Sequence, residues 1–339
     1  MNKIILLTDY RGHFYSSTTT NYASLNFNKV AKIFESSGFV VEIKSFSDID
    51  FRNQNYSKIF VLYQSSEDPD LRYKSFIDDI IYGLHLQGAI LIPGYEFFKA
   101  HHNKVFMEIL RDLSANYEIK NIKTKYYGTL EDFINRKSDL KYPLVLKSSE
   151  GAGSRGVVKV NNFKQAFKKV KFLSKSISLK YSFKDFLKQY YFKNYVSYSN
   201  FRRKLIAQNF ISNLNNDYKI LVYPYQIFIL KRENRKNDFR ASGSGLFEFT
   251  DQLPEGILEY SYQIFKSFNV PYISLDVAFN GNAFYLIEFQ FVSFGTLTLE
   301  KSPFHYEYQN EKWMKIDGKK NLEDVFAHSI IYYLKSNFK

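Results

Sequence analysis

The chain has 339 residues, of which 45% are hydrophobic and 24% charged, a composition typical of a globular protein with two or three domains. It contains no cysteine, which excludes disulfides and thiolate metal sites, and its apolar N-terminal run is too short for a signal peptide. The formal net charge is +13, and residues 161–240 hold 18 Lys or Arg against four Asp or Glu, so we expect an anionic partner near the middle of the chain. We predict a cytoplasmic protein without a transmembrane segment.

The first 97 residues alternate between expected strands and helices. Runs of apolar residues predict strands, and apolar residues at helical spacing before Gly38 and Gly88 predict two helices. The strands are expected at 3–10, 39–46, 58–66 and 89–95, and the helices at 25–38 and 73–88. This alternation indicates a parallel α/β sheet, whose ligands usually bind where the strands end. The loop 10–21 leaves the first strand at that edge, and we interpret His13 within it as a surface residue.

The remaining elements mix helices with antiparallel strands. We expect helices at 101–117, 161–173, 182–195, 254–269 and 322–335. We expect strands at 141–148, 157–160, 204–211, 219–232, 273–279 and 283–291. The helices at 161–173 and 182–195 carry much of the basic charge of the chain.

The segment KSSEGAGSRGVVKV, which starts at Lys147, is a glycine-rich loop between two strands. It is neither a P-loop nor a Rossmann fingerprint, because no Gly-Lys-Ser/Thr follows and the next element is a strand. A flap of this kind can close over phosphates with its backbone N–H groups, while a lysine at its base contacts them. Taken alone, such a loop is more often the turn of a hairpin than a phosphate-binding flap.

Five further motifs flank this loop in a fixed order. Before the glycine-rich loop, Asn103-Lys104 opens a helix. After the loop come three motifs in turn: the strand 206–211 (IAQNFI), Asp217-Tyr-Lys219 and Asp238-Phe-Arg240. The last motif joins Asp276 to the sequence Glu288-Phe-Gln290. This order resembles that of the ATP-grasp superfamily over about residues 98–300. The resemblance implies an ATP-grasp fold with a pre-grasp α/β domain at 1–97 and grasp subdomains at 98–207 and 208–339.

The resemblance also implies a role for each motif, with ATP and Mg²⁺ as cofactors. The expected ATP-binding residues are Lys104, Lys147, the flap residues Gly151, Gly153, Ser154 and Gly156, the adenine-reading hinge residues Gln208, Asn209 and Ile211, and Asp217 for the ribose. The expected Mg²⁺ ligands are Asp276, Glu288 and Gln290, and the expected catalytic cations are Arg240, Arg232 and Lys219. For Arg240, a structural salt bridge is an equal alternative.

Two positions depart from the family pattern. Gln290 stands where the family has Asn, and the Pro of the Pro-Gly that normally follows is missing. Ser242 replaces the Asn of the Asp-Phe-Arg-x-Asn motif. We interpret His305, which follows the metal motif, as a surface residue.

The hairpin formed by residues 273–291 decides whether Asp276 and Glu288 can share a metal ion. A two-residue turn at Asn280-Gly281 would send them to opposite faces. A three-residue loop pairs Phe279 with Ala283 and Asp276 with Leu286, and keeps an apolar face that includes Ile287. Since the other register would bury carboxylates, we expect the three-residue loop, with both carboxylates on one face toward the glycine flap.

We predict an ATP-dependent ligase that activates a carboxylate as an acyl-phosphate for attack by an amine. The sequence after Glu288 resembles that of ATP-grasp proteins from bacterial surface-polysaccharide clusters, which implies an amino-acid or sugar-acid substrate. The alternatives are an ATP-grasp kinase and a non-catalytic protein that binds anions or membranes. For residues 161–207, which we call the basic window, we favour a solvated face on core helices, then a surface for an anionic substrate or lipid headgroups, then nucleic acid. Homodimerisation is left open.

Overall fold

The computed structural model describes residues 3–16, 18–151, 156–236 and 238–338. The chain divides into two compact units, and each is described by itself. Unit 1 comprises Met1–His101, Ser114–Ile119 and Leu214–Lys339, and unit 2 comprises His102–Leu113 and Lys120–Asn213. No helix in the described part of the chain combines the length and the apolar character needed to cross a membrane.

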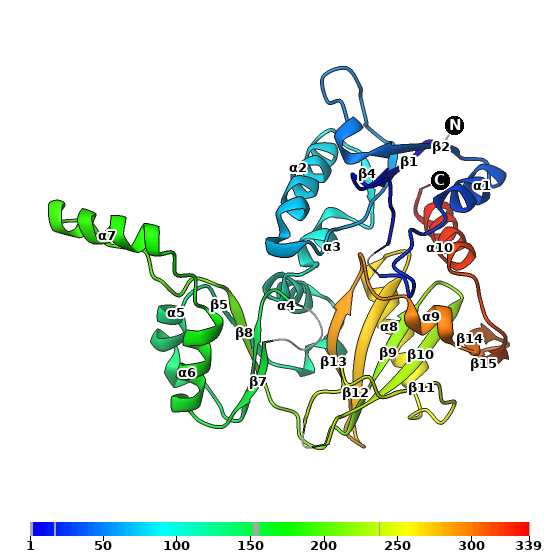
Figure 1. Cartoon of the computed structure of the whole chain (residues 1–339). Coiled ribbons are helices and arrows are strands. Elements are labelled where there is room, and N and C mark those ends of the chain that lie inside the picture. The colour runs from blue at the N-terminus through cyan, green and yellow to red at the C-terminus, as the bar shows by residue number, and fades with distance from the viewer. Residues whose placement is uncertain (1–2, 17, 152–155, 237, 339) are drawn as a thin grey trace. The chain divides into compact units, whose positions relative to one another are not determined.

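Unit 1 begins with a four-stranded sheet in the order β2-β1-β3-β4, and all of its strand pairs are parallel (Figure 1). Its strands are β1 (Lys3–Thr8), β2 (Val40–Ser45), β3 (Phe60–Leu62) and β4 (Ile90–Ile92). The helices of this part are α1 (Phe27–Ser36), α2 (Arg72–Leu86) and α3 (Tyr95–Ala100). The parallel α/β sheet predicted for the first 97 residues is confirmed.

The C-terminal helix α10 (Leu322–Asn337) packs beside α1, as Figure 1 shows. Asn321 caps α10, because its side chain accepts the N–H of Asp324. The buried residues Phe326 and Ile330 of α10 share one apolar core with Leu6 of β1 and Phe34 of α1. The last helix therefore helps to cover the sheet formed by the first strands.

A second sheet of unit 1 has seven strands, in the order β13-β12-β9-β10-β14-β15 with β11 paired to β10. The strands are β9 (Asn216–Val222), β10 (Gln226–Glu233), β11 (Phe247–Glu248), β12 (Ile273–Phe279), β13 (Phe284–Gln290), β14 (Phe304–Gln309) and β15 (Lys312–Asp317). Helices α8 (Ile257–Phe268) and α9 (Leu297–Lys301) accompany it. The hairpin β14–β15 was not predicted, because its exposed residues interrupt the apolar alternation that marks a strand.

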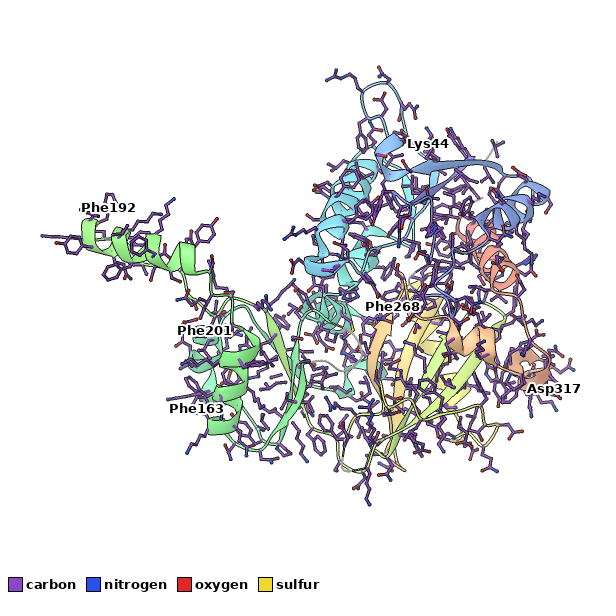
Figure 2. The ribbon with its side chains drawn as sticks, in the orientation of Figure 1. Lys44, Phe163, Phe192, Phe201, Phe268 and Asp317 are labelled. Atoms are coloured by element: carbon purple, nitrogen blue, oxygen red, sulfur yellow. The ribbon has the colours of Figure 1, made fainter. Side chains whose placement is uncertain are left out.

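Unit 2 contains a four-stranded antiparallel sheet in the order β5-β8-β6-β7. The strands are β5 (Thr124–Tyr127), β6 (Leu144–Ser148), β7 (Val157–Val160) and β8 (Leu205–Asn209). The helices are α4 (Lys104–Leu113), α5 (Leu130–Asn135), α6 (Phe163–Leu173) and α7 (Leu179–Tyr191). Side chains of α5, α6 and the sheet form one core, against which Phe163 and Phe201 pack (Figure 2).

Candidate functional site

Four neighbouring strands of the seven-stranded sheet place charged side chains on one face. Asp217 of β9 lies opposite Arg232 of β10, and Lys219 of β9 lies opposite Asp276 of β12. Asp276 in turn lies opposite Glu288 of β13. Side chains of directly opposed residues, and of residues two apart on a strand, project from the same face. We call these five residues the ionic row.

Ion pairs connect most of the ionic row. Arg232 Nε donates to Asp217 Oδ1 at 2.6 Å, and Arg232 Nη2 lies 2.9 Å from Asp276 Oδ2. Lys219 Nζ lies 3.0 Å from Asp276 Oδ1. Asp217, Arg232 and Asp276 are each 8% exposed, so two carboxylates have been removed from water and depend on these cations for their charge balance.

The two buried carboxyl groups have pKa values that shift in opposite directions. Burial raises the pKa of Asp217 to about 6, against the lowering effect of Arg232. Burial also acts to raise the pKa of Asp276, but Arg232 and Lys219 together hold it well below its ordinary value. These opposite shifts keep Asp276 ionised and make Asp217 the more readily protonated of the two, with a pKa of about 6.

We expect the Asp217 titration to appear in the pH dependence of stability. A folded-state pKa of about 6 means that folded protein keeps a proton that unfolded protein releases above about pH 4. The free energy of unfolding of wild type should therefore fall, relative to Asp217→Asn, as the pH rises from about 4 to about 6. Urea unfolding followed by fluorescence of the single tryptophan, Trp313 in unit 1, measures this difference. A difference that does not change across this range would contradict the assignment.

The β12–β13 hairpin has a register that differs from the predicted one. Phe279 pairs with Phe284, so the loop has four residues, 280–283, rather than three. Asn280 Oδ1 accepts the N–H groups of Asn282 at 3.0 Å and Ala283 at 2.9 Å, which closes the longer loop. The predicted pairings of Phe279 with Ala283 and of Asp276 with Leu286 are wrong.

A β-bulge restores the shared face of the two carboxylates. Val277 pairs with Leu286 while Asp276 pairs with Glu288, so Ile287 is the extra residue. The bulge allows Leu286 to be fully buried, whereas Ile287, which the prediction assigned to the core, is partly exposed. The prediction that Asp276 and Glu288 share one face is confirmed, and their direct opposition places the two Cα atoms about 4.5–5.5 Å apart.

The oxygen donors on this face fit a hard divalent cation. Carboxylate and amide oxygens are the protein ligands of Mg²⁺, and Gln290 lies two residues beyond Glu288 on the same strand. Lys219 Nζ contacts both Asp276, at 3.0 Å, and Gln290 Oε1, at 3.5 Å. Lys219 therefore places a positive charge against two of these oxygens.

Arg240 lies in the loop between β10 and β11, where it pairs with Asp238. Its Nη2 is 2.7 Å from Asp238 Oδ2, and its Nε donates to Asp238 Oδ1 at 2.9 Å. This is the salt bridge that the sequence left open as an alternative. A catalytic role for Arg240 remains a prediction and would require the guanidinium to exchange this partner for substrate.

In unit 2, the two predicted phosphate lysines lie at the base of the glycine loop. Lys147 is on β6 and only 7% exposed, so it is not a solvated residue at a strand end. Lys104 opens α4, its N–H donates to Ser149 O at 2.9 Å, and its Nζ donates to Gly151 O at 2.9 Å. Gly151 and Gly156 have φ angles of +110° and +77°, which glycine adopts without strain. The predicted flap residues Gly153 and Ser154 lie outside the described residues.

In the predicted adenine hinge, the side chain of Gln208 and the N–H of Asn209 already make hydrogen bonds within the protein. Gln208 is 3% exposed, and its Nε2 donates to Glu108 Oε1 at 3.0 Å and to Thr124 Oγ1 at 3.1 Å. The N–H of Asn209 donates to the carbonyl of Lys123 at 3.1 Å. An adenine-reading role therefore falls to the carbonyl of Asn209 and to the backbone of Ile211, and it stays a prediction.

Sequence reasoning missed the charged pair that holds Gln208. Glu108 and Arg111 of α4 are both fully buried, with Arg111 Nε 2.9 Å from Glu108 Oε2. Thr124 Oγ1 donates to the same carboxylate oxygen at 2.7 Å. Glu108 and Arg111 are three residues apart, so the sequence does place their charges on one helix face. Pairs at this spacing are common on exposed helices, so the spacing did not predict that this pair is buried.

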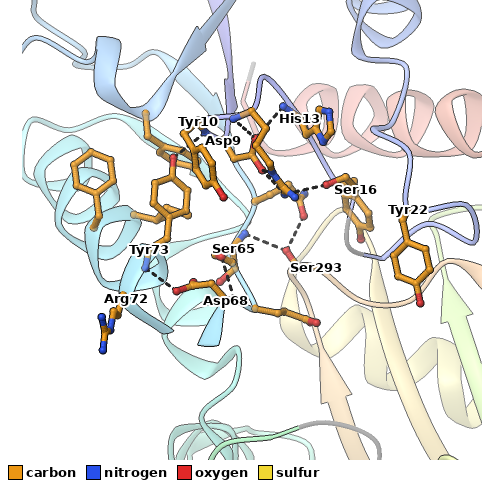
Figure 3. A pocket seen from close by; sticks show the side chains of 18 residues that line it. Asp9, Tyr10, His13, Ser16, Tyr22, Ser65, Asp68, Arg72, Tyr73 and Ser293 are labelled. Atoms are coloured by element: carbon orange, nitrogen blue, oxygen red, sulfur yellow. Dashed lines mark hydrogen bonds and ion pairs between the residues drawn. The ribbon is translucent and has the colours of Figure 1, made fainter. Parts of the chain in front are cut away.

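A pocket of about 770 Å³ lies in unit 1 where the parallel strands end (Figure 3). The loop after β1, which the sequence marked as a ligand loop, supplies Asp9, Arg11 and His13, and the loop after β3 supplies residues 64–68. Arg72 and Tyr73 of α2 and Ser293 also line the pocket, and Figure 3 labels all three. The structure therefore has a cavity at the place where open α/β sheets usually bind their ligands.

Several polar groups of this pocket are fixed by neighbours. Asp9 Oδ1 accepts the N–H groups of Arg11 at 2.8 Å and His13 at 3.0 Å. Ser293 Oγ donates to Gln64 Oε1 at 2.8 Å and accepts the N–H of Ser65 at 3.0 Å. Within the described residues, Gln64 Nε2 and His13 Nδ1 are buried and have no hydrogen-bond partner, so both are available to a ligand.

No protein-family profile and no curated protein sequence matches the chain. Among solved structures, D-cycloserine synthetase DcsG matches with a TM-score of 0.54 and 10% identity, over 98% of this chain and 100% of that chain. D-alanyl-alanine synthetase A from Vibrio cholerae O1 biovar eltor matches with a TM-score of 0.54 and 12% identity, over 99% of each chain. The ATP-grasp ligase PsnB, complexed with a minimal precursor, matches with a TM-score of 0.51 and 11% identity, over 97% of this chain and 99% of that chain. The order of motifs predicted this result, and the chain has the ATP-grasp fold with an N-terminal parallel α/β sheet.

Proposed function

We propose that the chain is an ATP-dependent ligase that joins a carboxylate to an amine and releases ADP and phosphate. The observation that carries the proposal is the ionic row, in which Asp276 and Glu288 face each other beside Lys219 and Arg232. The full-length matches to two synthetases and a ligase support it. In unit 2, Lys104 and Lys147 at the base of the glycine loop supply the positive charge that phosphates require.

The proposed reaction has two steps. An oxygen of the substrate carboxylate attacks the γ-phosphorus of ATP, which forms an acyl-phosphate and releases ADP. The amine then attacks the carbonyl carbon, loses a proton and expels phosphate. Lys219, Arg232 and Arg240 would stabilise the negative charge that develops on the transferred phosphoryl group.

Apart from Gln208, the remaining predicted residues each have a place in this proposal. Asp276, Glu288 and Gln290 would hold Mg²⁺, which when bound neutralises charge on the phosphates. The backbone of Gly151, Gly153, Ser154 and Gly156 would approach the phosphates, and Asn209 and Ile211 would contact adenine. Asp217 would hold Arg232 in position, because its contact with the ribose would require their 2.6 Å ion pair to open.

The pocket at the end of the parallel strands is the proposed site of the carboxylate substrate. Its wall combines the cations Arg11 and Arg72 with the acidic residues Asp9, Glu67 and Asp68, the buried donor Gln64 Nε2 and the ring of Tyr73, and Arg11 pairs with Asp9. These groups suit a small acid that also carries hydroxyl or amino groups, such as an amino acid or a sugar acid. The resemblance of the sequence after Glu288 to ATP-grasp proteins of surface-polysaccharide clusters is the ground for proposing a role in surface-polysaccharide or small-metabolite biosynthesis.

The proposed function is tested by a screen for ADP release over pairs of carboxylates and amines, with ATP and Mg²⁺ present. Ligation predicts release that requires one carboxylate and rises further with one amine. A stable phosphorylated product without any amine would assign the chain as a kinase instead. ADP release that responds to no carboxylate would contradict both enzymatic assignments.

Lys147→Ala is expected to weaken ATP binding with the fold intact. Loss of a charge-assisted contact costs roughly 1.5–3 kcal/mol of binding free energy, so the dissociation constant should rise at least about tenfold. Calorimetric titration with ATP measures the change. The matched control is Lys141→Ala, which removes an exposed lysine of the same unit and should leave the dissociation constant as it is. An unchanged constant in Lys147→Ala would remove this residue from the site.

A further inference from the structure

Helix α7 carries an apolar stripe that the described part of the protein leaves exposed. Phe183, Phe186, Leu187 and Tyr190 recur at the spacing of one helix face. Phe183 is 66% exposed, Phe186 64% and Tyr190 79%. Figure 2 shows the α7 side chains spreading outward from the helix, with Phe192 labelled just beyond its end. We call these four residues the aromatic stripe.

The chain itself packs on the opposite side of α7. After the helix, the segment 192–200 returns along it, and Tyr195 Oη donates to Asp185 Oδ1 at 2.6 Å. Gln189 Nε2 donates to Ser197 Oγ at 3.0 Å, and Lys188 Nζ lies 5.1 Å from the centre of the Tyr195 ring. The protein thus covers the polar side of α7 with its own segment and leaves the aromatic stripe facing outward.

Positive charge lies on the same helix as the aromatic stripe and on the segment that follows it. Residues 175–203 hold seven Lys or Arg against one acidic residue, Asp185, whose carboxylate accepts the bond from Tyr195. The exposed Lys184 lies on the helix, and Lys193, Arg202 and Arg203 are exposed on the segment that follows. This segment also exposes Phe192, Val196 and Tyr198. Exposed apolar side chains with exposed cations on the same helix and segment are complementary to a lipid surface, which is apolar inside and carries anionic headgroups outside.

Helix α6 shows that these features are not a general property of the basic window. Ala166 and Val170 of α6 are fully buried in the core of unit 2, so the lysines of α6 form the solvated face of a core helix. Among the α7 residues whose side chains are described, none is buried. The favoured interpretation of the basic window therefore describes α6 and leaves the aromatic stripe of α7 unexplained.

We propose that α7 and the segment after it dock on a membrane surface that contains anionic lipid. Phe and Tyr side chains beside lysines suit the boundary between headgroups and acyl chains, into which an amphipathic helix inserts its apolar face. The cations attract anionic headgroups. A second copy of this chain is the poorer fit, because pairing two such surfaces would bring like charges together. An extended peptide is also a poorer fit, because α7 presents a convex surface.

The test is co-flotation of the full chain with vesicles of phosphatidylcholine, with and without phosphatidylglycerol. We expect binding only to vesicles with phosphatidylglycerol, and release at high salt, because the screening length falls from about 10 Å at 0.1 M to about 3 Å at 1 M. Phe186→Ser/Tyr190→Ser should lower the partition coefficient at least about tenfold, since both rings lose their burial in lipid. Leu86→Ser/Leu113→Ser, which changes two exposed apolar residues outside α7, is the matched control and should bind as wild type does.

Three results would overturn the proposal. The first is failure of wild type to float with phosphatidylglycerol vesicles. The second is an equal loss of binding in the matched control. The third is a dimer, seen by sedimentation at rising protein concentration, that Phe186→Ser/Tyr190→Ser dissociates, because a second copy would then be the occupant. Since neither α7 residue belongs to the proposed ATP site, ADP release by these variants separates failure of this proposal from failure of the proposed function.

Discussion

Replacing Glu288 with alanine is expected to abolish Mg²⁺-dependent ATP turnover while the protein stays folded. Glu288 lies directly opposite Asp276, and the two carboxylates supply the charge of the proposed metal site. A bound divalent cation contributes several kcal/mol to the stabilisation of the transition state, so turnover should fall by about 100-fold or more. The side chain is half-buried at the sheet surface, so its truncation should leave no large cavity in the core.

Two controls separate metal binding from general damage. Glu255→Ala removes an exposed carboxylate of the same unit and should turn over ATP as wild type does. Glu288→Gln keeps an oxygen ligand but loses its charge, so its apparent affinity for Mg²⁺ should lie between those of wild type and Glu288→Ala. Calorimetric titration of Mg²⁺ in the presence of ADP reads this affinity without turnover. Full turnover by Glu288→Ala would remove the metal assignment.

The sequence predicted the fold because its signals were local and their order was specific. Apolar runs between Gly38, Gly88 and polar loops set out a parallel α/β sheet, and the structure has it. Asn269 was predicted to end a helix, and it follows α8 with a φ angle of +48°, a conformation that asparagine tolerates. Glycine, asparagine and apolar spacing act over a few residues, so they can be interpreted without knowledge of the tertiary structure.

The register of the β12–β13 hairpin is a feature that local sequence signals did not predict. The Asn280 side chain closes a four-residue loop, and the bulge at Ile287 then compensates for the added residue. Neither feature changes the alternation of apolar residues in a way that the sequence alone reveals. The shared face of Asp276 and Glu288 was nevertheless predicted, because the cost of burying carboxylates constrains the outcome whatever the loop length.

Burial of polar residues was the other property that the sequence did not show. His305, interpreted as a surface residue, is 1% exposed, stacks on Phe228 with ring centres 5.5 Å apart, and lies 2.8 Å from Glu307. That interpretation is wrong because β14 pairs with β10, and this pairing brings together segments almost 80 residues apart. A contact of this range leaves no periodic signal in either segment.

Glu108→Ala is expected to lower the free energy of unfolding of unit 2 by about 3–5 kcal/mol. The carboxylate and Arg111 are both fully buried, and the carboxylate also accepts hydrogen bonds from Thr124 and Gln208. Its removal takes the countercharge from a guanidinium that water cannot reach, and this costs far more than the loss of an exposed pair. The same change frees the side chain of Gln208 on β8, next to the proposed adenine hinge.

Native-state hydrogen exchange at β5 and β8 measures this change, because Trp313 lies in unit 1 and its fluorescence does not report on unit 2. The matched control is Asp139→Ala in the same unit, which breaks the exposed pair of Asp139 with Lys125 and should change the exchange little. Glu108→Met/Arg111→Met removes both charges together and should recover most of the protection lost in Glu108→Ala. If Glu108→Ala exchanged no faster than Asp139→Ala, the buried pair would not be what holds α4 and β8 together. If the double variant lost as much protection as the single one, the cost would come from packing and the hydrogen bonds of Thr124 and Gln208, rather than from an unbalanced charge.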